Sequence, residues 1–311
     1  MRRFSIIAKD WWDFTTLDKE LMEEASKLTI DDIQKLSRPG FEVKIFDTLD
    51  SFFLTEAFEY VHCWEKSTKR KPSGMCGPIG PVHQLPRVAD IINNMEINLI
   101  EAHYWGMDDW YIEDSENHII PPSLSIIFKR LCYDLIREDL RMPEENLHFV
   151  NKDNIIEFSK SFDELNCLIM QGGQGRAKHW AYNDPVKRTG KYQDNPPTPE
   201  EYKEFKTRIV DIHPLSNIQV ASYFSGGDLF KIPDKGITVG PVETWKCDKI
   251  SIWHPGYHDD YFGMRLTTLM ISKKIMDSSV PISLLASHPN VSFNFYRGGI
   301  GSCEVNLDKI L

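Results

Sequence analysis

The chain has 311 residues, of which 41% are hydrophobic and 26% charged, as is typical of a globular protein with a buried core. Its net charge of −10 disfavours a nucleic-acid-binding surface, and no apolar run approaches the ~20 residues of a membrane span. The first apolar stretch ends at Lys9-Asp10, which is too early for a secretory signal, and the six cysteines include no CxxC pair. We therefore expect a cytoplasmic protein with reduced cysteines and with neither a nucleic-acid nor a membrane partner.

Residues 1–40 are expected to form a polar N-terminal helical extension, with helical patterns at 17–28 and 29–36. Thr29, followed by Ile-Asp-Asp, is the expected N-cap of the second helix. Pro39-Gly40 ends the extension, and residues 41–311 are expected to form one α/β domain. Surface packing is the role that we favour for the extension, with a lid or an oligomer contact as the alternatives.

Strands and helices alternate along the rest of the chain. Helical patterns are found at residues 49–66, 84–94, 121–140 and 154–164. Strand patterns are found at residues 43–46, 97–103, 167–170, 237–239, 249–253, 280–286 and 291–295. Residues 186–203 are polar and contain three prolines, which indicates an excursion from the main fold. This alternation predicts an α/β fold with a mostly parallel sheet that helices cover on both faces.

The strand pattern at 167–170 runs into the segment Gly-Gly-Gln-Gly-Arg-Ala-Lys-His-Trp-Ala-Tyr-Asn-Asp-Pro, residues 172–185. Glycines allow a tight turn and a close approach of a ligand to the backbone. In open α/β sheets, ligands bind beyond the carboxyl ends of the strands, which is where His179 and Asp184 would lie. The pattern is consistent with a sugar-sized active site, although its spacing fits an ordinary glycine turn equally well.

This segment resembles the signature of the glucosamine-6-phosphate deaminase/isomerase family, in which a GGxGxDGHxAFNEP loop follows a strand. A second stretch, Gly106-Met-Asp-Asp-Trp-Tyr111, is similar to the MDEY segment of the family. Weaker similarity continues at residues 207–209, 236–240 and 286–289, so that the resemblance covers roughly residues 70–297. It implies a Rossmann-like three-layer sandwich of the glucosamine-6-phosphate isomerase type.

The resemblance also implies an activity, the interconversion of an aldose amino sugar and a ketose through an enol-type intermediate, without an organic cofactor. Asp108 matches the base of the family that transfers the proton, and Asp109 matches its acidic neighbour. His179 matches the histidine that opens the sugar ring, and Asp184 stands in place of the glutamate that orients it. Ala177 departs from the pattern, because the family has an aspartate two residues before the histidine.

The same resemblance suggests which residues contact the substrate. They are Gly77, Ile79 and Gly80 in an early glycine loop, Gly172, Gly173 and Gly175 in the signature loop, and Lys178 and Arg208. The early loop, however, has no hydroxyl side chain, and its Pro78 and Pro81 lack the N–H that a phosphate would accept from.

The cations that would bind a phosphate are also missing. The arginine position of the family falls near Asn217, and its lysine position falls near His258-Asp259. The remaining cations that could compensate are Arg176, Lys178, Arg208 and Arg265. We therefore hypothesise that the substrate lacks the usual terminal phosphate or carries a different polar group.

Two other functions stay open. One is that of a 6-phosphogluconolactonase-like hydrolase, which belongs to the same superfamily, and the other is that of a sugar-binding sensor without catalysis. Ala177 favours the sensor, whereas Asp108 and His179 argue against it. His254 and the following acids do not form a recognised metal motif, and Pro255-Gly256 indicates a loop there, so we expect no metal. A small-molecule sugar is the expected partner, and we expect a homo-oligomer.

Overall fold

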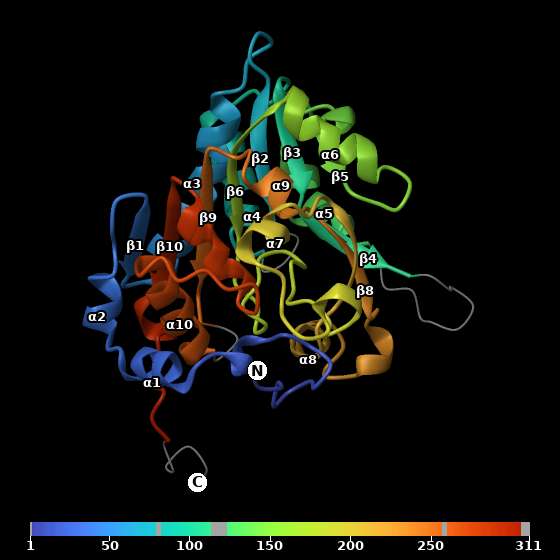
Figure 1. The fold of residues 1–311 in the computed structure, drawn as a ribbon. Helices are drawn as coiled ribbons and strands as arrows, with labels where there is room; N and C mark the ends of the chain where they lie inside the picture. The colour runs from blue at the N-terminus through green and yellow to red at the C-terminus, as the bar shows by residue number, and fades with distance from the viewer. Residues whose placement is uncertain (1, 79–81, 113–122, 257–259, 306–311) are drawn as a thin grey trace.

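A computed structural model describes residues 2–78, 82–112, 123–256 and 260–305 (Figure 1). Its main sheet has seven strands in the order β1-β10-β9-β6-β2-β3-β5, and every neighbouring pair is parallel. In this order the strands are Phe41–Phe46, Val291–Tyr296, Lys249–His254, Asn166–Gly172, Ser73–Gly77, Ala102–Gly106 and Leu147–Phe149. The predicted α/β class with a mostly parallel sheet is confirmed.

Helices cover both faces of this sheet. One apolar cluster contains side chains of α3 (Leu49–Glu65), α4 (Leu85–Met95) and α5 (Ser125–Leu131), and the other contains side chains of α6 (Ile155–Glu164) and α10 (Tyr261–Ser272). Consecutive strand residues such as Tyr104 and Trp105 belong to opposite clusters. Because neighbouring side chains of a strand point to opposite faces, the two clusters lie on the two sides of the sheet.

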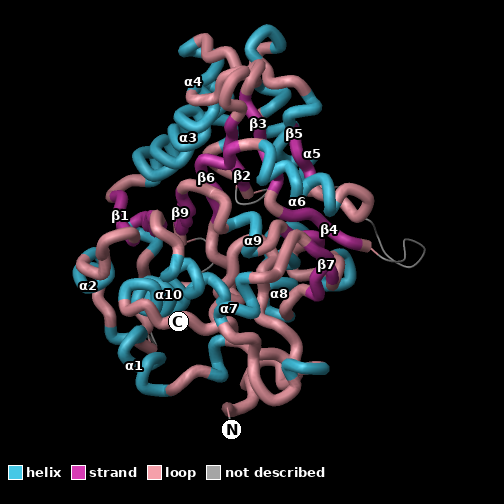
Figure 2. Tube along the Cα trace, turned by 45° about the horizontal axis from the view of Figure 1, so that its top comes forward, coloured by secondary structure: helices cyan, strands magenta, loops and turns pink. Residues whose placement is uncertain are grey.

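A second, antiparallel sheet was not predicted. It contains β4 (Asp108–Tyr111), β8 (Lys235–Thr238) and β7 (Arg208–Asp211), in that order. Figure 2 shows β4 and β7 to one side of the main sheet, near α8 (Pro214–Phe224). The predicted strand at 237–239 therefore exists, but it belongs to this small sheet.

Three other predicted elements differ from the structure. The strand expected at 97–103 begins only at Ala102, and the helix expected at 121–140 is α5 followed by two 3-10 turns, because the helix ends at Cys132 with φ −134° and ψ −68°. Residues 121 and 122 lie outside the described residues. The strand expected at 280–286 is a 3-10 helix, Pro281–Ser287. Pro281 stands at its first position, where the fixed φ of proline favours a helical turn over a sheet strand.

The N-terminal residues are tightly packed against the rest of the chain. They form the 3-10 turn η1 (Phe14–Thr16) and the helices α1 (Lys19–Lys27) and α2 (Ile30–Gln34). Thr29 caps α2 in a capping box with Asp32, which confirms the predicted N-cap. Leu17, Ala25 and Ile33 are buried in the same apolar cluster as α10.

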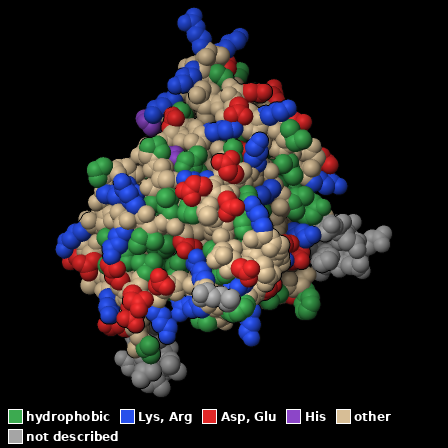
Figure 3. Space-filling view, in the orientation of Figure 1, with side chains coloured by type: hydrophobic (Ala, Val, Ile, Leu, Met, Phe, Trp, Pro, Cys, Tyr) green, Lys and Arg blue, Asp and Glu red, His purple; other side chains and the backbone are tan. Residues whose placement is uncertain are grey.

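The remaining helices lie in the connections between strands. The polar residues 186–203 contain the 3-10 turn η5 (Gly190–Tyr192) and α7 (Pro199–Lys203), and α9 (Pro241–Thr244) follows β8. On the face shown in Figure 3, acidic and basic side chains are interspersed. Within the described residues, none of the helices is long and apolar enough to cross a membrane.

Candidate active site

A cavity of about 120 Å³ lies where β6 and β9 end and β4 begins. This is the carboxyl edge of the parallel sheet, where ligands bind in open α/β folds. Its polar lining comes from four segments and comprises Asp108, Gln174, His179, Ser216, Gln219 and His254. Gly173 and Gly175 of the signature loop complete this part of the wall.

His179 and Asp184 form a hydrogen-bonded pair inside the cavity wall. Nδ1 of His179 faces Oδ1 of Asp184, and the Ser216 hydroxyl also donates to Oδ1, at 2.8 Å. The backbone N–H of His213 donates to Oδ2, at 2.8 Å. Burial alone would raise the pKa of Asp184, but its contacts with His179 and His213 hold that pKa below its ordinary value. Asp184 is therefore a carboxylate that fixes the imidazole orientation.

The backbone of the signature loop explains why the sequence is rich in glycine there. A Cβ on Gly175 would lie 1.9 Å from Nε2 of His179, so only glycine leaves room for the imidazole. On either side of the histidine, Lys178 and Ala181 have φ values of 63° and 48°. Positive φ is unfavourable for residues with a Cβ, and such strain concentrates at functional sites.

Asp108 and Asp109 point in opposite directions, because they are neighbours on strand β4. Asp108 lines the cavity, where burial and the adjacent charge of Asp109 raise its pKa to about 7, although His179 acts in the other direction. Asp109 lies outside the cavity lining, and its carboxylate accepts from the N–H groups of Trp110 and Leu124 and from the Ser123 hydroxyl. The structure therefore places the Asp108 carboxyl in the cavity. The Asp109 carboxylate lies outside it and accepts hydrogen bonds from its neighbours.

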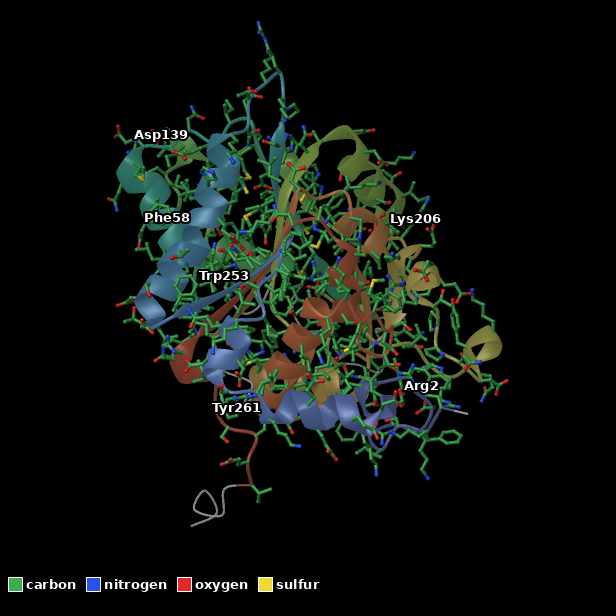
Figure 4. All side chains as sticks on the ribbon, turned by 60° about the vertical axis from the view of Figure 1, so that its left-hand side comes forward. Arg2, Phe58, Asp139, Lys206, Trp253 and Tyr261 are labelled. Atoms are coloured by element: carbon green, nitrogen blue, oxygen red, sulfur yellow. The ribbon has the colours of Figure 1, made fainter. Side chains whose placement is uncertain are left out.

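The rest of the cavity is apolar and aromatic. It is lined by Pro78, Met107, Leu124, Ala181, Tyr182, Val220, Tyr223, Phe224, Trp253 and Pro255. Figure 4 shows Trp253 in the interior of the molecule, close to the sheet. Among the described residues that line this cavity, none is Lys or Arg. Nε2 of Gln174 is buried without a hydrogen-bond partner in the described part of the chain, so this amide can donate to a ligand hydroxyl.

The other predicted contact residues lie at different distances from the cavity. Gly172 ends β6 beneath Met107, whereas Gly77 is packed against the rings of Tyr104 and Tyr60, and neither is part of the lining. The predicted contacts Ile79 and Gly80, and the predicted lysine position near His258, lie outside the described residues.

The cations that could have replaced the missing phosphate ligands are engaged elsewhere. Lys178 is buried against Asp260 at 2.5 Å and the carbonyl of Arg176 at 2.7 Å. The Arg208 guanidinium donates to Asn183 at 3.1 Å, and that of Arg265 donates to three backbone carbonyls. The cavity lining contains none of the four candidate cations, Arg176, Lys178, Arg208 and Arg265.

Several lining residues were missed in the sequence. Ser216, Gln219, Val220, Tyr223 and Phe224 recur at helical spacing on one face of α8, which is the only signal that could have grouped them. Nothing local indicated that this face would cover the signature loop. Within the described residues, no group of three or more His, Cys, Asp or Glu is arranged to hold a metal ion.

Solved structures share this fold, although no protein-family model and no curated protein sequence matches the chain. A monomeric glucosamine-6-phosphate deaminase matches with a TM-score of 0.63 and 16% identity, over 83% of this chain and 98% of that chain. The 6-phosphogluconolactonase from Plasmodium vivax matches with a TM-score of 0.58 and 13% identity, over 90% and 96% of the two chains. The 6-phosphogluconolactonase from Thermotoga maritima matches with a TM-score of 0.52 and 13% identity, over 82% and 100%. The chain therefore has the fold that the sequence resemblance implied.

Proposed function

We propose that the chain is an enzyme that interconverts an aldose and a ketose form of a sugar or amino sugar, with or without release of ammonia. The observation that carries the proposal is Asp108, a cavity carboxyl whose pKa is raised to about 7, beside the His179–Asp184 pair. A base with a pKa near the working pH is well suited to take and return a proton at carbon. The resemblance to the deaminase/isomerase family and the shared fold support the same chemistry.

In this mechanism Asp108 removes the proton from C2 of the open-chain sugar and returns it at C1. His179 moves a proton between the ring oxygen and its hydroxyl to open the pyranose. Because Nδ1 of His179 is held by Asp184, Nε2 is the nitrogen left to face the substrate. Ala177 is buried and outside the cavity lining, so ring opening would depend on His179 without the second acid of the family.

We further propose that the end of the substrate remote from the reacting carbons is uncharged. Val220, Tyr223 and Phe224 line the cavity, and no described lining residue is Lys or Arg. The undescribed residues nearest in sequence to the lining, 79–81, 113–122 and 257–259, also contain neither Lys nor Arg. A phosphate dianion would lose water there without a cationic partner, which weakens binding. Aromatic rings and the Gln174 amide suit the C–H faces and hydroxyls of a free sugar.

Hydrolysis of a neutral sugar lactone is the second candidate. It is favoured by the presence of Ala177, since a lactonase needs no ring-opening acid, and the matching structures include 6-phosphogluconolactonases. In that reaction His179, oriented by Asp184, would act as the base that activates water.

Proton NMR in D₂O tests the proposal. Deuterium incorporation at C1 and C2 is followed for glucosamine, glucose and fructose and for their 6-phosphates. We expect exchange with a free sugar, a loss of about 10²- to 10⁴-fold in Asp108→Asn, and no loss in the control Asp139→Asn. Asp139 is an exposed acid that is paired with Arg137, and Figure 4 shows it at the periphery of the molecule.

Each other outcome changes a defined part of the proposal. Saturable micromolar binding of glucosamine 6-phosphate would refute the uncharged substrate. Hydrolysis of gluconolactone without any exchange would favour the lactonase. Binding of a free sugar with neither exchange nor hydrolysis would identify a sensor.

A further inference from the structure

The N-terminal segment, residues 2–18, packs against residues that contact the His179–Asp184 pair. In Figure 1 this segment passes below α8 and continues to α1. The contact is made at His213, the N-cap residue of α8, which is completely buried. His213 therefore links two parts of the chain that lie far apart in the sequence.

His213 contacts the site through its backbone and the N-terminal segment through its ring. Its N–H holds Oδ2 of Asp184 at 2.8 Å. Its Nδ1 accepts from the N–H of Leu215 at 3.1 Å, so a neutral ring carries its proton on Nε2. Nε2 lies 3.4 Å from Oδ2 of Asp13, and the Trp11 ring packs edge-on against the imidazole with the centroids 4.9 Å apart.

Asp13 is itself held in place by neighbours within the segment. Oδ1 accepts from the Thr15 N–H at 2.9 Å and from its hydroxyl at 2.6 Å, and Oδ2 accepts from the Ser5 hydroxyl. Burial would raise the pKa of Asp13, but the contacts with His213, Ser5 and Thr15 outweigh it and hold the pKa below its ordinary value. A completely buried carboxylate thus faces the His213 imidazole.

The segment is also bound to the chain that directly follows Asp184. The Trp12 N–H donates to Val186 O at 3.0 Å, and the Arg188 N–H donates to Asp10 O at 2.7 Å. The Arg188 guanidinium lies over the Trp12 ring, 3.8 Å from its centroid. The N-terminal segment therefore contacts both the loop that contains Asp184 and the N-cap residue of α8, which donates to Asp184.

We propose that Asp13 and Trp11 are positioning residues of the active site, which hold His213 so that its N–H fixes Asp184 and thereby His179. The proposal rests on the proposed function only in taking His179 and Asp184 as the acid–base pair. It gives the N-terminal segment a task beyond packing. Asp184 is one methylene shorter than the glutamate of the resembling family, and a short side chain depends more on backbone placement.

The test reads the His179 imidazole directly and needs no substrate. Long-range ¹H–¹⁵N correlations through the carbon-bound ring protons report which ring nitrogen is protonated, and the spectrum of His179→Gln assigns the signal. In the unaltered protein we expect His179 to be protonated at Nδ1, toward Asp184. In Asp13→Asn, we expect a mixture of the two neutral tautomers of His179.

The matched control is Thr16→Val, which removes a buried hydroxyl of the same segment. Within the described residues, this hydroxyl bonds to the Asp13 carbonyl, Arg2 and Ser279 and makes no hydrogen bond to His213. We expect this control to leave the His179 signals unchanged even if both variants lose similar stability. Unchanged His179 signals in folded Asp13→Asn would overturn the proposal.

Kinetics provide a second readout if the NMR assay of the proposed function finds a substrate. Asp13 lies outside the cavity lining, so Asp13→Asn should lower kcat about tenfold, as expected when the charge that faces the His213 ring at 3.4 Å is removed, with KM unchanged. An equal loss in Thr16→Val, or a rise in KM alone, would contradict positioning. If no sugar reacts, the proposed function fails, whereas the tautomer measurement still decides the role of Asp13.

Discussion

Asp108→Asn should stabilise the protein at neutral pH while it slows the proposed proton transfer. The pKa of this cavity carboxyl is raised from 3.8 to about 7 by burial and by the charge of Asp109. Between these two pH values the folded chain keeps a proton that the unfolded chain has released, so ionisation favours unfolding as the pH rises. Asparagine has no such charge, and the penalty disappears.

The size of the effect follows from the two pKa values. Each pH unit between them is worth about 1.4 kcal/mol, which sets an upper limit of about 4 kcal/mol above pH 7. Water in the cavity screens the charge, so we expect about 1–3 kcal/mol at pH 8. Below pH 4 both states are protonated, and the two proteins should be nearly equal in stability apart from the change in shape and hydrogen bonding.

Urea unfolding of Asp108→Asn and of the unaltered chain, at intervals from pH 4.5 to 8.5, measures this difference. The difference in the free energy of unfolding should increase up to pH 7 and then become constant. The control Asp139→Asn should show no rise over this range, because hydrogen bonds from Arg137 lower the pKa of Asp139. A difference for Asp108→Asn that does not change with pH would show that its carboxyl titrates normally and would refute its assignment as a base tuned to neutral pH.

Three further changes test the architecture of the site. Gly175→Ala places a methyl group 1.9 Å from Nε2 of His179, so deuterium exchange should fall at least about tenfold while circular dichroism still shows a folded chain; unchanged exchange would show that the ring is free to move. Ser216→Ala removes one donor to Asp184 and should cost about 0.5–1.5 kcal/mol in urea unfolding, and a neutral result would mean that water replaces the hydroxyl. Glu59→Ala removes a largely buried carboxylate that accepts hydrogen bonds from four side chains and should cost about 3 kcal/mol in thermal unfolding, and a much smaller loss would mean that water satisfies the donors. The donors left by this last change are Gln171, Lys249, Ser251 and Trp253.

Part of the main sheet was predictable because β6 and its neighbours β9 and β10 are apolar runs in the sequence. The central strand β2 (Ser73–Gly77) was instead expected to be part of a glycine loop, because glycine, serine and cysteine in it hide the apolar pattern of a strand. The run from Cys167 to Met170 is apolar since the strand is buried on both faces, and the glycines that follow stop it. The same kind of apolar run led to a wrong prediction at residues 280–286, where the expected strand is a buried 3-10 helix. Burial alone does not distinguish the two, and Pro281 was the residue that could have done so.

The antiparallel sheet and most of the cavity lining could not be predicted, because no sequence pattern marks them. Strands β4, β7 and β8 have four residues each, too few for a period to stand out, and their pairing joins distant parts of the chain. Reading Asp108 and Asp109 as consecutive strand residues would have separated their roles, because one side chain must then face away. The contact between Asp13 and His213 depends entirely on tertiary structure and could not be inferred from spacing.

Helix α8 shows how recognition of the substrate can diverge while the acid–base pair is kept. Ser216 at its start donates to Asp184, and Tyr223 and Phe224 at its end line the cavity, about 10–12 Å away at 1.5 Å per residue. One helix therefore contributes both to the surroundings of the acid–base pair and to the aromatic end of the cavity. Under the proposed function, an uncharged end of the substrate at Tyr223 and Phe224 would leave the hydrogen bonds of Asp184 unchanged.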